Sequence, residues 1–230
     1  MKKKVFELER LGGTKSVEIA FDKVFAIGYA GRDTSKTMAH IKELEEQLGV
    51  PAPARIPTIF QCSVYTLRQE ENIEFLGSQT CGEVEYVIVT QGEKLYIGLG
   101  SDHTDRKLES VSVPKAKQIC AKPLSRKLWD YDEVKDHWDE IALRSWQMVD
   151  GEKVLYQDGG VRDILSVEDN LRELRERVGD IDNAVIFSGT VPLLKGFLYG
   201  EKFFCEMVDP RLDRNNAFAY SVEVIPEEER

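Results

Sequence analysis

Residues 83–102 read EVEYVIVTQGEKLYIGLGSD, and this stretch indicates the fold class. Its two runs rich in β-branched and aromatic residues, 83–90 and 95–99, are separated by a Gln-Gly turn, which is typical of neighbouring strands. Because side chains alternate along a strand, Glu83, Glu85 and Val87 share one face. Asp102 follows where the second run gives way to a turn.

Two carboxylates at the head of an apolar face need a physical explanation. Left unpaired, Glu83 and Glu85 would repel each other and resist the loss of water, so either the strand end is solvated or a cation lies between them. Asp102 also has two interpretations, as a structural turn former or as a third ligand. We assign His103 a surface or hydrogen-bonded role rather than a metal.

The rest of the sequence mixes strands and helices. A hairpin is expected from the runs 5–8 and 16–20 around Gly12-Gly13. Helices are expected at 35–48, at about 132–148, and from Ser166 to Gly179, where capping residues mark the first and the last of them. Further strands are expected at 64–67, 73–76, 184–188, 202–208 and 218–225. No linker or repeat interrupts the chain, so we place all 230 residues in one α+β domain.

Composition excludes several classes of protein. The chain is 42% hydrophobic and 31% charged, as in ordinary globular proteins, and its net charge of -10 without a basic stripe opposes binding to nucleic acid. No apolar stretch reaches the roughly 18 residues of a membrane span, and the basic start acquires Glu7 before any long apolar run. We expect a cytoplasmic protein with no nucleic-acid and no membrane partner. The four cysteines, at 62, 81, 120 and 205, lack the spacing of a metal site, so we expect reduced, buried thiols.

The first predicted helix carries a possible acid–base pair. His40 and Glu43 lie three residues apart on one helix face and can touch. A carboxylate that orients an imidazole is an arrangement for general base catalysis, although the same pair is also found on ordinary helix surfaces.

Taken in order, these pieces resemble the fumarylacetoacetate hydrolase-like family. Its members show a His-x-x-Glu, a Glu-x-Glu strand, an Asp-x-Thr/Ser-Ala-Arg turn, a Lys and a late Gly-Thr. The same order appears here in His40-Ile41-Lys42-Glu43, Glu83-Val84-Glu85, Asp102-His103-Thr104-Asp105-Arg106, Lys117 and Gly189-Thr190. The strings at 28–33 (GYAGRD) and 100–106 (GSDHTDR) resemble most closely the DUF2848 branch, from which no activity can be inferred.

The resemblance implies a mixed β-roll with a few flanking helices, formed by residues 24–222. Residues 1–22 would be an N-terminal hairpin extension and 226–230 an acidic, solvated tail. It further implies a Mg²⁺ or Mn²⁺ ion held by Glu83, Glu85 and Asp102, which suits the preference of hard cations for carboxylates. Arg106, Glu109, Gln157 and Thr190 would contact substrate, and a homodimer is expected. Two positions depart from the family pattern, since Lys107 replaces an acid and Glu109 an amide.

The leading hypothesis for function is a metal-dependent enzyme that cleaves a carbon–carbon bond. The substrate would be a small oxo acid or 1,3-dicarbonyl compound, reacting through a metal-bound enolate. His40, oriented by Glu43, would take a proton from water, and Lys117 would face the oxyanion. A decarboxylase or tautomerase would use the same site. A non-catalytic metal-binding or ligand-binding protein on the same fold is the alternative from a different class.

Overall fold

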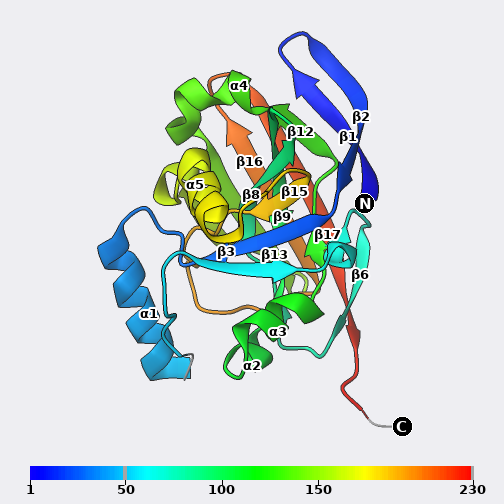
Figure 1. The fold of residues 1–230 in the computed structure, drawn as a ribbon. Helices are drawn as coiled ribbons and strands as arrows, with labels where there is room; N and C mark the ends of the chain where they lie inside the picture. The colour runs from blue at the N-terminus through cyan, green and yellow to red at the C-terminus, as the bar shows by residue number, and fades with distance from the viewer. Residues whose placement is uncertain (49–50, 229–230) are drawn as a thin grey trace.

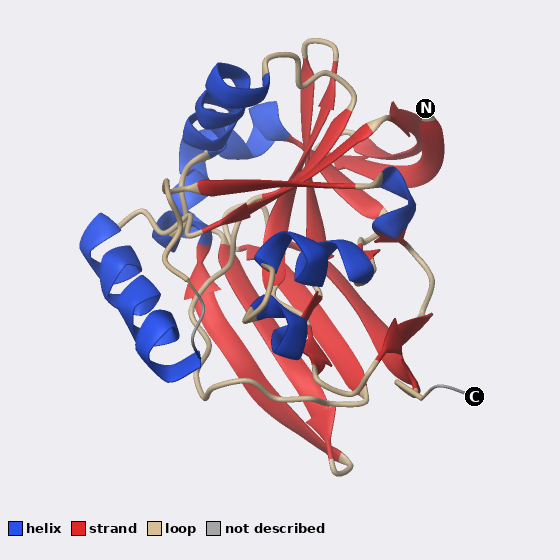
Figure 2. Ribbon diagram, turned by 60° about the horizontal axis from the view of Figure 1, so that its bottom comes forward, coloured by secondary structure: helices blue, strands red, loops and turns tan. Residues whose placement is uncertain are grey.

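The computed structural model describes residues 1–48 and 51–228, and for His40, Glu43, Leu44, Gln47 and Leu48 it describes the backbone alone. Strands form most of the body, with the helices placed around them (Figures 1 and 2). The described helices are α1 (Thr34–Leu48), α2 (Arg106–Glu109), α3 (Val113–Ile119), α4 (Tyr131–Val134) and α5 (Val167–Val178), with short 3₁₀ segments η1 (Val64–Thr66), η2 (Lys135–Glu140) and η3 (Val161–Asp163).

The larger sheet has eight strands in the order β2-β1-β12-β9-β8-β15-β3-β4. It is mixed, because β1 runs parallel to β12 and β15 parallel to β3, while the other pairs are antiparallel. The strands are β1 (Lys2–Arg10), β2 (Gly13–Phe21), β3 (Lys23–Gly28), β4 (Thr58–Cys62), β8 (Val84–Gln91), β9 (Lys94–Ser101), β12 (Lys127–Asp130) and β15 (Ala184–Phe187).

A second sheet has five strands in the order β14-β13-β16-β17-β6. Two short pairs, β10-β7 and β11-β5, complete the described strands. The bounds are β5 (Leu67–Arg68), β6 (Asn72–Leu76), β7 (Thr80–Cys81), β10 (Thr104–Asp105), β11 (Lys122–Pro123), β13 (Ala142–Val149), β14 (Glu152–Gly160), β16 (Lys202–Asp209) and β17 (Arg214–Ile225).

The larger sheet is buried on both faces and curls on itself. On one face, Tyr86 and Ile88 of β8 join Phe203 and Tyr220 of the second sheet in one core cluster. On the other face, Val87 and Val89 belong to a second cluster. This cluster contains residues from both ends of the sheet, namely Phe6 and Phe21 of the β1–β2 hairpin at one end and Phe60 and Cys62 of β4 at the other. Strands that stand far apart in the order can share a core only if the sheet bends round. The predicted α+β class and mixed β-roll are confirmed.

Most of the predicted elements are present. The hairpin, the helix at 35–48 and the helix after Ser166 are confirmed as β1–β2, α1 and α5. The Ser166 hydroxyl accepts a hydrogen bond from the Asp169 amide at 3.1 Å and donates one to the Asp169 carboxylate at 2.9 Å, so the predicted cap has formed. All four cysteines are free and buried, as expected.

The predicted helix at 132–148 is wrong over its second half. Residues 131–140 form α4 and η2, but β13 begins at Ala142 and pairs with both β14 and β16. The inward positions of β13 include Ser145 and Gln147, which are buried because they bond Gln157 and the amide of Gly200. These polar residues at core positions concealed the alternation that marks a strand.

The predicted strand at 64–67 is also wrong, except at its last residue. Val64–Thr66 is the 3₁₀ turn η1, and β5 begins only at Leu67. The amide and the hydroxyl of Thr66 both bond the carbonyl oxygen of Ser63, at 3.0 and 2.8 Å, and this closes the turn. Within the described residues, no helix combines the length and the apolar character that spanning a membrane requires.

Candidate metal centre

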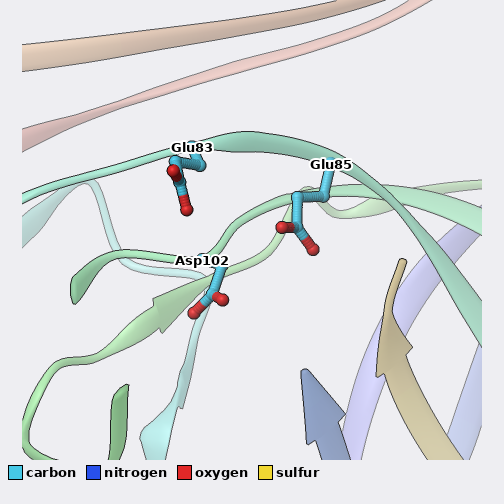
Figure 3. A group of neighbouring side chains, drawn as sticks. All are labelled: Glu83, Glu85 and Asp102. Carbon is cyan, nitrogen blue, oxygen red and sulfur yellow. The ribbon is translucent and has the colours of Figure 1, made fainter. Parts of the chain in front are cut away.

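The hairpin of β8 and β9 brings the three predicted carboxylates together. Glu85 lies opposite Gly100, and the Asp102 amide donates a hydrogen bond of 3.0 Å to the Glu83 carbonyl, so the pairing continues past the strand ends. Figure 3 shows the three side chains on the same side of the two chain segments. One oxygen from each carboxylate lies within 4.8 Å of the others. The prediction that these residues meet is confirmed.

The donor set fits a hard divalent cation. In an octahedral Mg²⁺ site, opposite ligand oxygens are about 4.2 Å apart and adjacent ones about 3 Å apart, so the three carboxylate oxygens, which lie within 4.8 Å of one another, would close around an ion by shifts of about an ångström each. All three donors are carboxylates, which suits Mg²⁺ or Mn²⁺ better than zinc. Among the described residues no other group of three such ligands lies this close.

Glu85 is the most deeply buried member of the cluster, with 2% of its surface exposed. Its carboxylate accepts a hydrogen bond of 3.0 Å from the Gly189 amide. Burial raises the pKa of Glu85 well above its usual value, the charge of Asp102 raises it further, and Lys117 opposes both. A bound cation would stabilise the ionised form of Glu85, because it would replace the favourable interaction with water that burial removes.

Asp102 lies between two buried lysines. Lys117 of α3 donates to one carboxylate oxygen at 2.5 Å, and Lys122 of β11 lies 2.9 Å from the other. That oxygen, Oδ1, forms a buried ion pair with the Lys122 ammonium. Burial alone would raise the pKa of Asp102, but Lys117 and Lys122 outweigh it and hold that pKa below its usual value. Asp102 is therefore ionised, and a bound cation would share its carboxylate with the two ammonium groups.

Arg106 connects the acidic cluster to the predicted substrate residue Glu109. Its guanidinium lies 3.3 Å from a Glu83 oxygen and donates to Glu109 at 3.0 Å. The side chain is 4% exposed, and the ring of Phe197 stacks on it at 4.6 Å. The structure thus brings Arg106 and Glu109 to the edge of the cluster. Lys107, the other departure from the family pattern, points elsewhere and pairs with Glu227 at 3.4 Å.

The loop after β15 fixes the start of β8. The Thr190 hydroxyl donates to the Val84 carbonyl at 2.6 Å and accepts from the Gln157 amide at 2.7 Å. Gln157 also donates to the Val191 carbonyl, while its oxygen accepts from the Val84 amide and the Ser145 hydroxyl. These four hydrogen bonds use the full capacity of the Gln157 amide. Thr190 and Gln157 therefore lie next to the cluster and hold its strand, while their contact with substrate stays a prediction.

The predicted pair His40 and Glu43 lies on α1, at the left edge of Figure 1. Their side chains fall outside the described part of the structure, so their role as a catalytic pair stays a prediction. His103 is buried and its Nδ1 lies 2.9 Å from the Tyr220 hydroxyl, with its ring stacked on Phe75. This is the hydrogen-bonded role assigned to it from the sequence.

Two contacts of the site were not predicted, one made by the side chain of Lys122 and one by the backbone amide of Gly189. Lys122 is completely buried and bonds the His103 carbonyl as well as contacting Asp102. No spacing rule marks it, because its neighbours are set by the turn from α3 into β11. Gly189 has a φ of 93° and supplies the amide that bonds Glu85. The Gly-Thr string was noticed, but the use of its backbone amide depends on how β15 pairs with β8.

Several solved structures share the fold of this chain at low sequence identity. The structure of 2-keto-3-deoxy-D-arabinonate dehydratase complexed with magnesium and 2,5-dioxopentanoate is 16% identical, with a TM-score of 0.66 over 95% of this chain and 79% of that chain. A yeast fumarylacetoacetate hydrolase family protein is 17% identical, with a TM-score of 0.62 over 91% and 97%. The 4-oxalocrotonate decarboxylase from Pseudomonas putida G7, complexed with magnesium and adipate, is 12% identical, with a TM-score of 0.53 over 90% and 79%.

These likenesses establish the fold alone, which is that of the fumarylacetoacetate hydrolase family. No curated protein matches the sequence. The family model described as "Protein of unknown function (DUF2848)" matches residues 27–220, a range that contains both halves of the β8–β9 hairpin, the acidic cluster and the Gly189 loop. The chain therefore belongs to the DUF2848 family.

Proposed function

We propose that this protein is an enzyme that uses Mg²⁺ or Mn²⁺ to cleave a carbon–carbon bond in a small oxo acid or 1,3-dicarbonyl compound. The observation that carries the proposal is the cluster of Glu83, Glu85 and Asp102, whose oxygens lie within 4.8 Å of one another beside a buried lysine and arginine. Structural neighbours named for an oxo acid dehydratase and an oxalocrotonate decarboxylase, both with magnesium complexes, support the same substrate class.

The three carboxylates would hold the ion. When bound, a divalent ion supplies Lewis-acid stabilisation of negative charge on the oxygens of a chelating oxo acid. Glu83, Glu85 and Asp102 would leave room on the ion for water or substrate oxygens, as magnesium sites usually do.

Lys117 would donate a hydrogen bond to the oxygen on which negative charge develops. Burial alone would lower the pKa of the Lys117 ammonium, but Asp102, Glu83 and Glu109 outweigh it and raise that pKa above its usual value. Lys117 therefore stays protonated at neutral pH and cannot act as a base. It is suited to donate to an oxyanion, an effect worth about 3 kcal/mol at other active sites.

His40, oriented by Glu43, would take the proton from the attacking water. Arg106 would hold a carboxylate of the substrate, since a guanidinium presents several donors in a plane. Glu109 would lie next to the substrate, because its carboxylate pairs with Arg106. Thr190 and Gln157 would lie on the same side and hold the strand that carries the metal ligands.

The same residues would also serve a decarboxylase, a tautomerase or a dehydratase, because each of these reactions places negative charge on an oxygen next to the reacting carbon. The neighbouring structures are named for a dehydratase, a decarboxylase and the fumarylacetoacetate hydrolase family, so their names support dehydration, decarboxylation and hydrolysis alike. A non-catalytic binding protein is supported less, because Lys107, one of the two departures from the family pattern, points to Glu227 and away from the cluster.

Metal binding and turnover test the proposal together. Mn²⁺ should bind the purified protein with one site, and Glu85→Gln should abolish this, while Glu74→Gln, an exposed residue of β6, should not. Mg²⁺ should then support turnover of at least one compound among acylpyruvates, oxaloacetate, fumarylpyruvate and 2-keto-3-deoxy sugar acids. Failure to bind Mn²⁺ would contradict the whole proposal. Binding without turnover of any of these compounds would favour a binding protein.

A further inference from the structure

Arg106 is engaged by protein groups at each of its three side-chain nitrogens. Its Nη1 donates a hydrogen bond of 3.0 Å to Glu109, and its Nε donates one of 3.1 Å to the Cys81 sulfur. Its Nη2 donates to the Cys81 carbonyl at 3.5 Å and lies 3.3 Å from a Glu83 oxygen. The ring of Phe197 stacks on the guanidinium at 4.6 Å. A carboxylate of a ligand that pairs with Arg106 must therefore compete with carboxylates that the protein already supplies.

Glu109 is held beside Arg106 by a single turn of helix. It is the last residue of α2 and lies three residues after Arg106, so the two side chains share one helix face. The Asp105 carboxylate accepts a hydrogen bond of 2.8 Å from the Leu108 amide and fixes the start of this turn. The Arg106 side chain is 4% exposed, whereas those of Glu109 and Glu83 are each 18% exposed. An anion that approaches the guanidinium from solvent therefore meets carboxylates.

The other two cations next to the acidic cluster are also paired. Lys117 and Lys122 both contact Asp102, at 2.5 and 2.9 Å, and Lys122 donates to the His103 carbonyl as well. Together with Arg106 they give three cations, and these face four carboxylates, namely Glu83, Glu85, Asp102 and Glu109. With all of these groups ionised, a divalent ion would leave the site with one net positive charge, which one carboxylate of a ligand neutralises. A second carboxylate would find no unpaired buried cation among the described residues.

We propose that this site takes 2-oxo acids with a single carboxylate and discriminates against dicarboxylates, and that Glu109 is the residue that sets this preference. The inference rests on the proposed function and narrows its substrate class. Glu109 stands where the family pattern has an amide, and its negative charge beside Arg106 opposes a second carboxylate of the ligand. Among the compounds named above, acylpyruvates and 2-keto-3-deoxy sugar acids fit this site, and oxaloacetate and fumarylpyruvate do not.

The test compares two ligands of equal chain length. 2-Oxopentanoate ends in a methyl group where 2-oxoglutarate has its second carboxylate, and neither contains a 1,3-dicarbonyl unit that the protein could cleave. Calorimetry measures the affinity of the full chain for Mn²⁺ alone and for each oxo acid at saturating Mn²⁺, in the wild type, Glu109→Gln and Glu227→Gln. Glu227 is the matched control, because it is a more exposed carboxylate that pairs with Lys107, the neighbour of Arg106 in the sequence.

We expect the wild type to bind 2-oxopentanoate about tenfold more tightly than 2-oxoglutarate. Glu109→Gln should bind 2-oxoglutarate about tenfold more tightly than the wild type does, because the amide oxygen can still accept from Arg106 but carries no charge. Its affinities for 2-oxopentanoate and for Mn²⁺ should stay unchanged. Glu227→Gln should match the wild type in all three affinities.

Each contrary outcome has one meaning. A wild type that binds 2-oxoglutarate as tightly as 2-oxopentanoate would overturn the inference and leave the proposed function intact. The same preference in wild type and Glu109→Gln would also overturn it, as would a loss of Mn²⁺ affinity in this variant, because Glu109 would then act on the metal ligands. A wild type that binds Mn²⁺ but neither oxo acid would contradict the proposed function and this inference with it, and a wild type that binds no Mn²⁺ would contradict the metal site itself.

Discussion

The charged side chains at the centre of the site differ in how their burial is compensated. Asp102 has two ammonium groups as neighbours, whereas Glu85 accepts one hydrogen bond from a backbone amide and has a raised pKa. Removing one partner of a buried ion pair leaves the other charge without compensation, while removing an uncompensated charge relieves a cost. The two carboxylates should therefore respond in opposite ways to the same change.

Asp102→Asn should lower the free energy of unfolding of the metal-free protein by about 3–5 kcal/mol, because Lys117 and Lys122 lose their partner. Glu85→Gln should leave that free energy unchanged or raise it, because the amide oxygen can still accept from Gly189 and no charge is buried. Urea denaturation in EDTA measures both. Equal destabilisation by the two variants would show that Glu85 is compensated as fully as Asp102.

Gly189 combines a positive φ with a close approach to Ala30. A methyl group there would lie 2.6 Å from the Ala30 Cβ and 3.1 Å from the Ile27 carbonyl oxygen. Gly189→Ala should therefore cost more than 2 kcal/mol of stability, above the roughly 1 kcal/mol of backbone strain alone, and should weaken Mn²⁺ binding by displacing the amide from Glu85.

Gly92→Ala is the matched control for this substitution. Gly92 also has a positive φ, 58°, but a Cβ there meets nothing within 4 Å. We expect it to cost only the backbone strain, about 1 kcal/mol, and to leave Mn²⁺ binding unchanged. If both glycine variants cost the same and bind Mn²⁺ equally, the close approach at Gly189 does not contribute to the site.

At the scale of single residues, the sequence predicted the positions that follow from the alternation of side chains along a strand and from the β8–β9 hairpin. Glu83 and Glu85 had to share a face, and Asp102 had to follow the paired strand. The contact of Lys122 with Asp102 could not be predicted. It depends on the turn from α3 into β11 and on the burial of the Lys122 ammonium against the His103 carbonyl. Contacts between distant segments leave no local signal.

Among the elements, α5 was predicted best because capping residues mark both of its ends. Ser166 and Asp169 form a reciprocal cap, and Gly179 ends the helix with a φ of 84°. The strand β13 was predicted worst, because its inward Ser145 and Gln147 carry hydrogen bonds where apolar residues usually carry the pattern. Local chemistry marks helix ends, whereas a polar core conceals a strand.

Ser166→Ala should lower the free energy of unfolding by about 1 kcal/mol, since the amide of Asp169 loses its acceptor. Thermal and urea denaturation at neutral pH measure the loss. Ser16→Ala, at an exposed position of β2, is the control and should change stability by less than about 0.5 kcal/mol. A neutral outcome for Ser166→Ala would mean that solvent replaces the cap without cost.

The same cap gives a pH dependence with a definite sign. The hydrogen bond from Ser166 and the ion pair with Arg172 lower the pKa of Asp169 below its usual value. A carboxylate whose folded pKa is lowered adds stability above its unfolded pKa of about 3.9, and this contribution is lost as the pH falls through the lower folded value. The stability difference between wild type and Asp169→Asn should thus be constant from about pH 5 upward and shrink below about pH 4. A difference that grows on acidification would contradict this assignment.

For the whole molecule, the fold was predicted through the ordered set of motifs and not through periodicity. Eight strands in the order β2-β1-β12-β9-β8-β15-β3-β4 join segments from residue 2 to residue 187. Such an order depends on which distant surfaces bury each other, and no local pattern records it. The order of the His-x-x-Glu, Glu-x-Glu, Asp-x-Thr and Gly-Thr strings did carry this information, because the strings lie at fixed places on one fold.

A ligand that binds only the folded molecule must stabilise all of it. Mn²⁺ at 100 times its dissociation constant should add about 2.7 kcal/mol, which raises the melting temperature of a chain of this size by about 5–10 °C. The shift should grow with the logarithm of the Mn²⁺ concentration and disappear with EDTA. Glu85→Gln should melt at the same temperature with and without Mn²⁺, whereas Glu74→Gln should follow the wild type. If Mn²⁺ still raised the melting temperature of Glu85→Gln, the ion would bind outside the acidic cluster, because loss of one of the three ligands would not have weakened its binding.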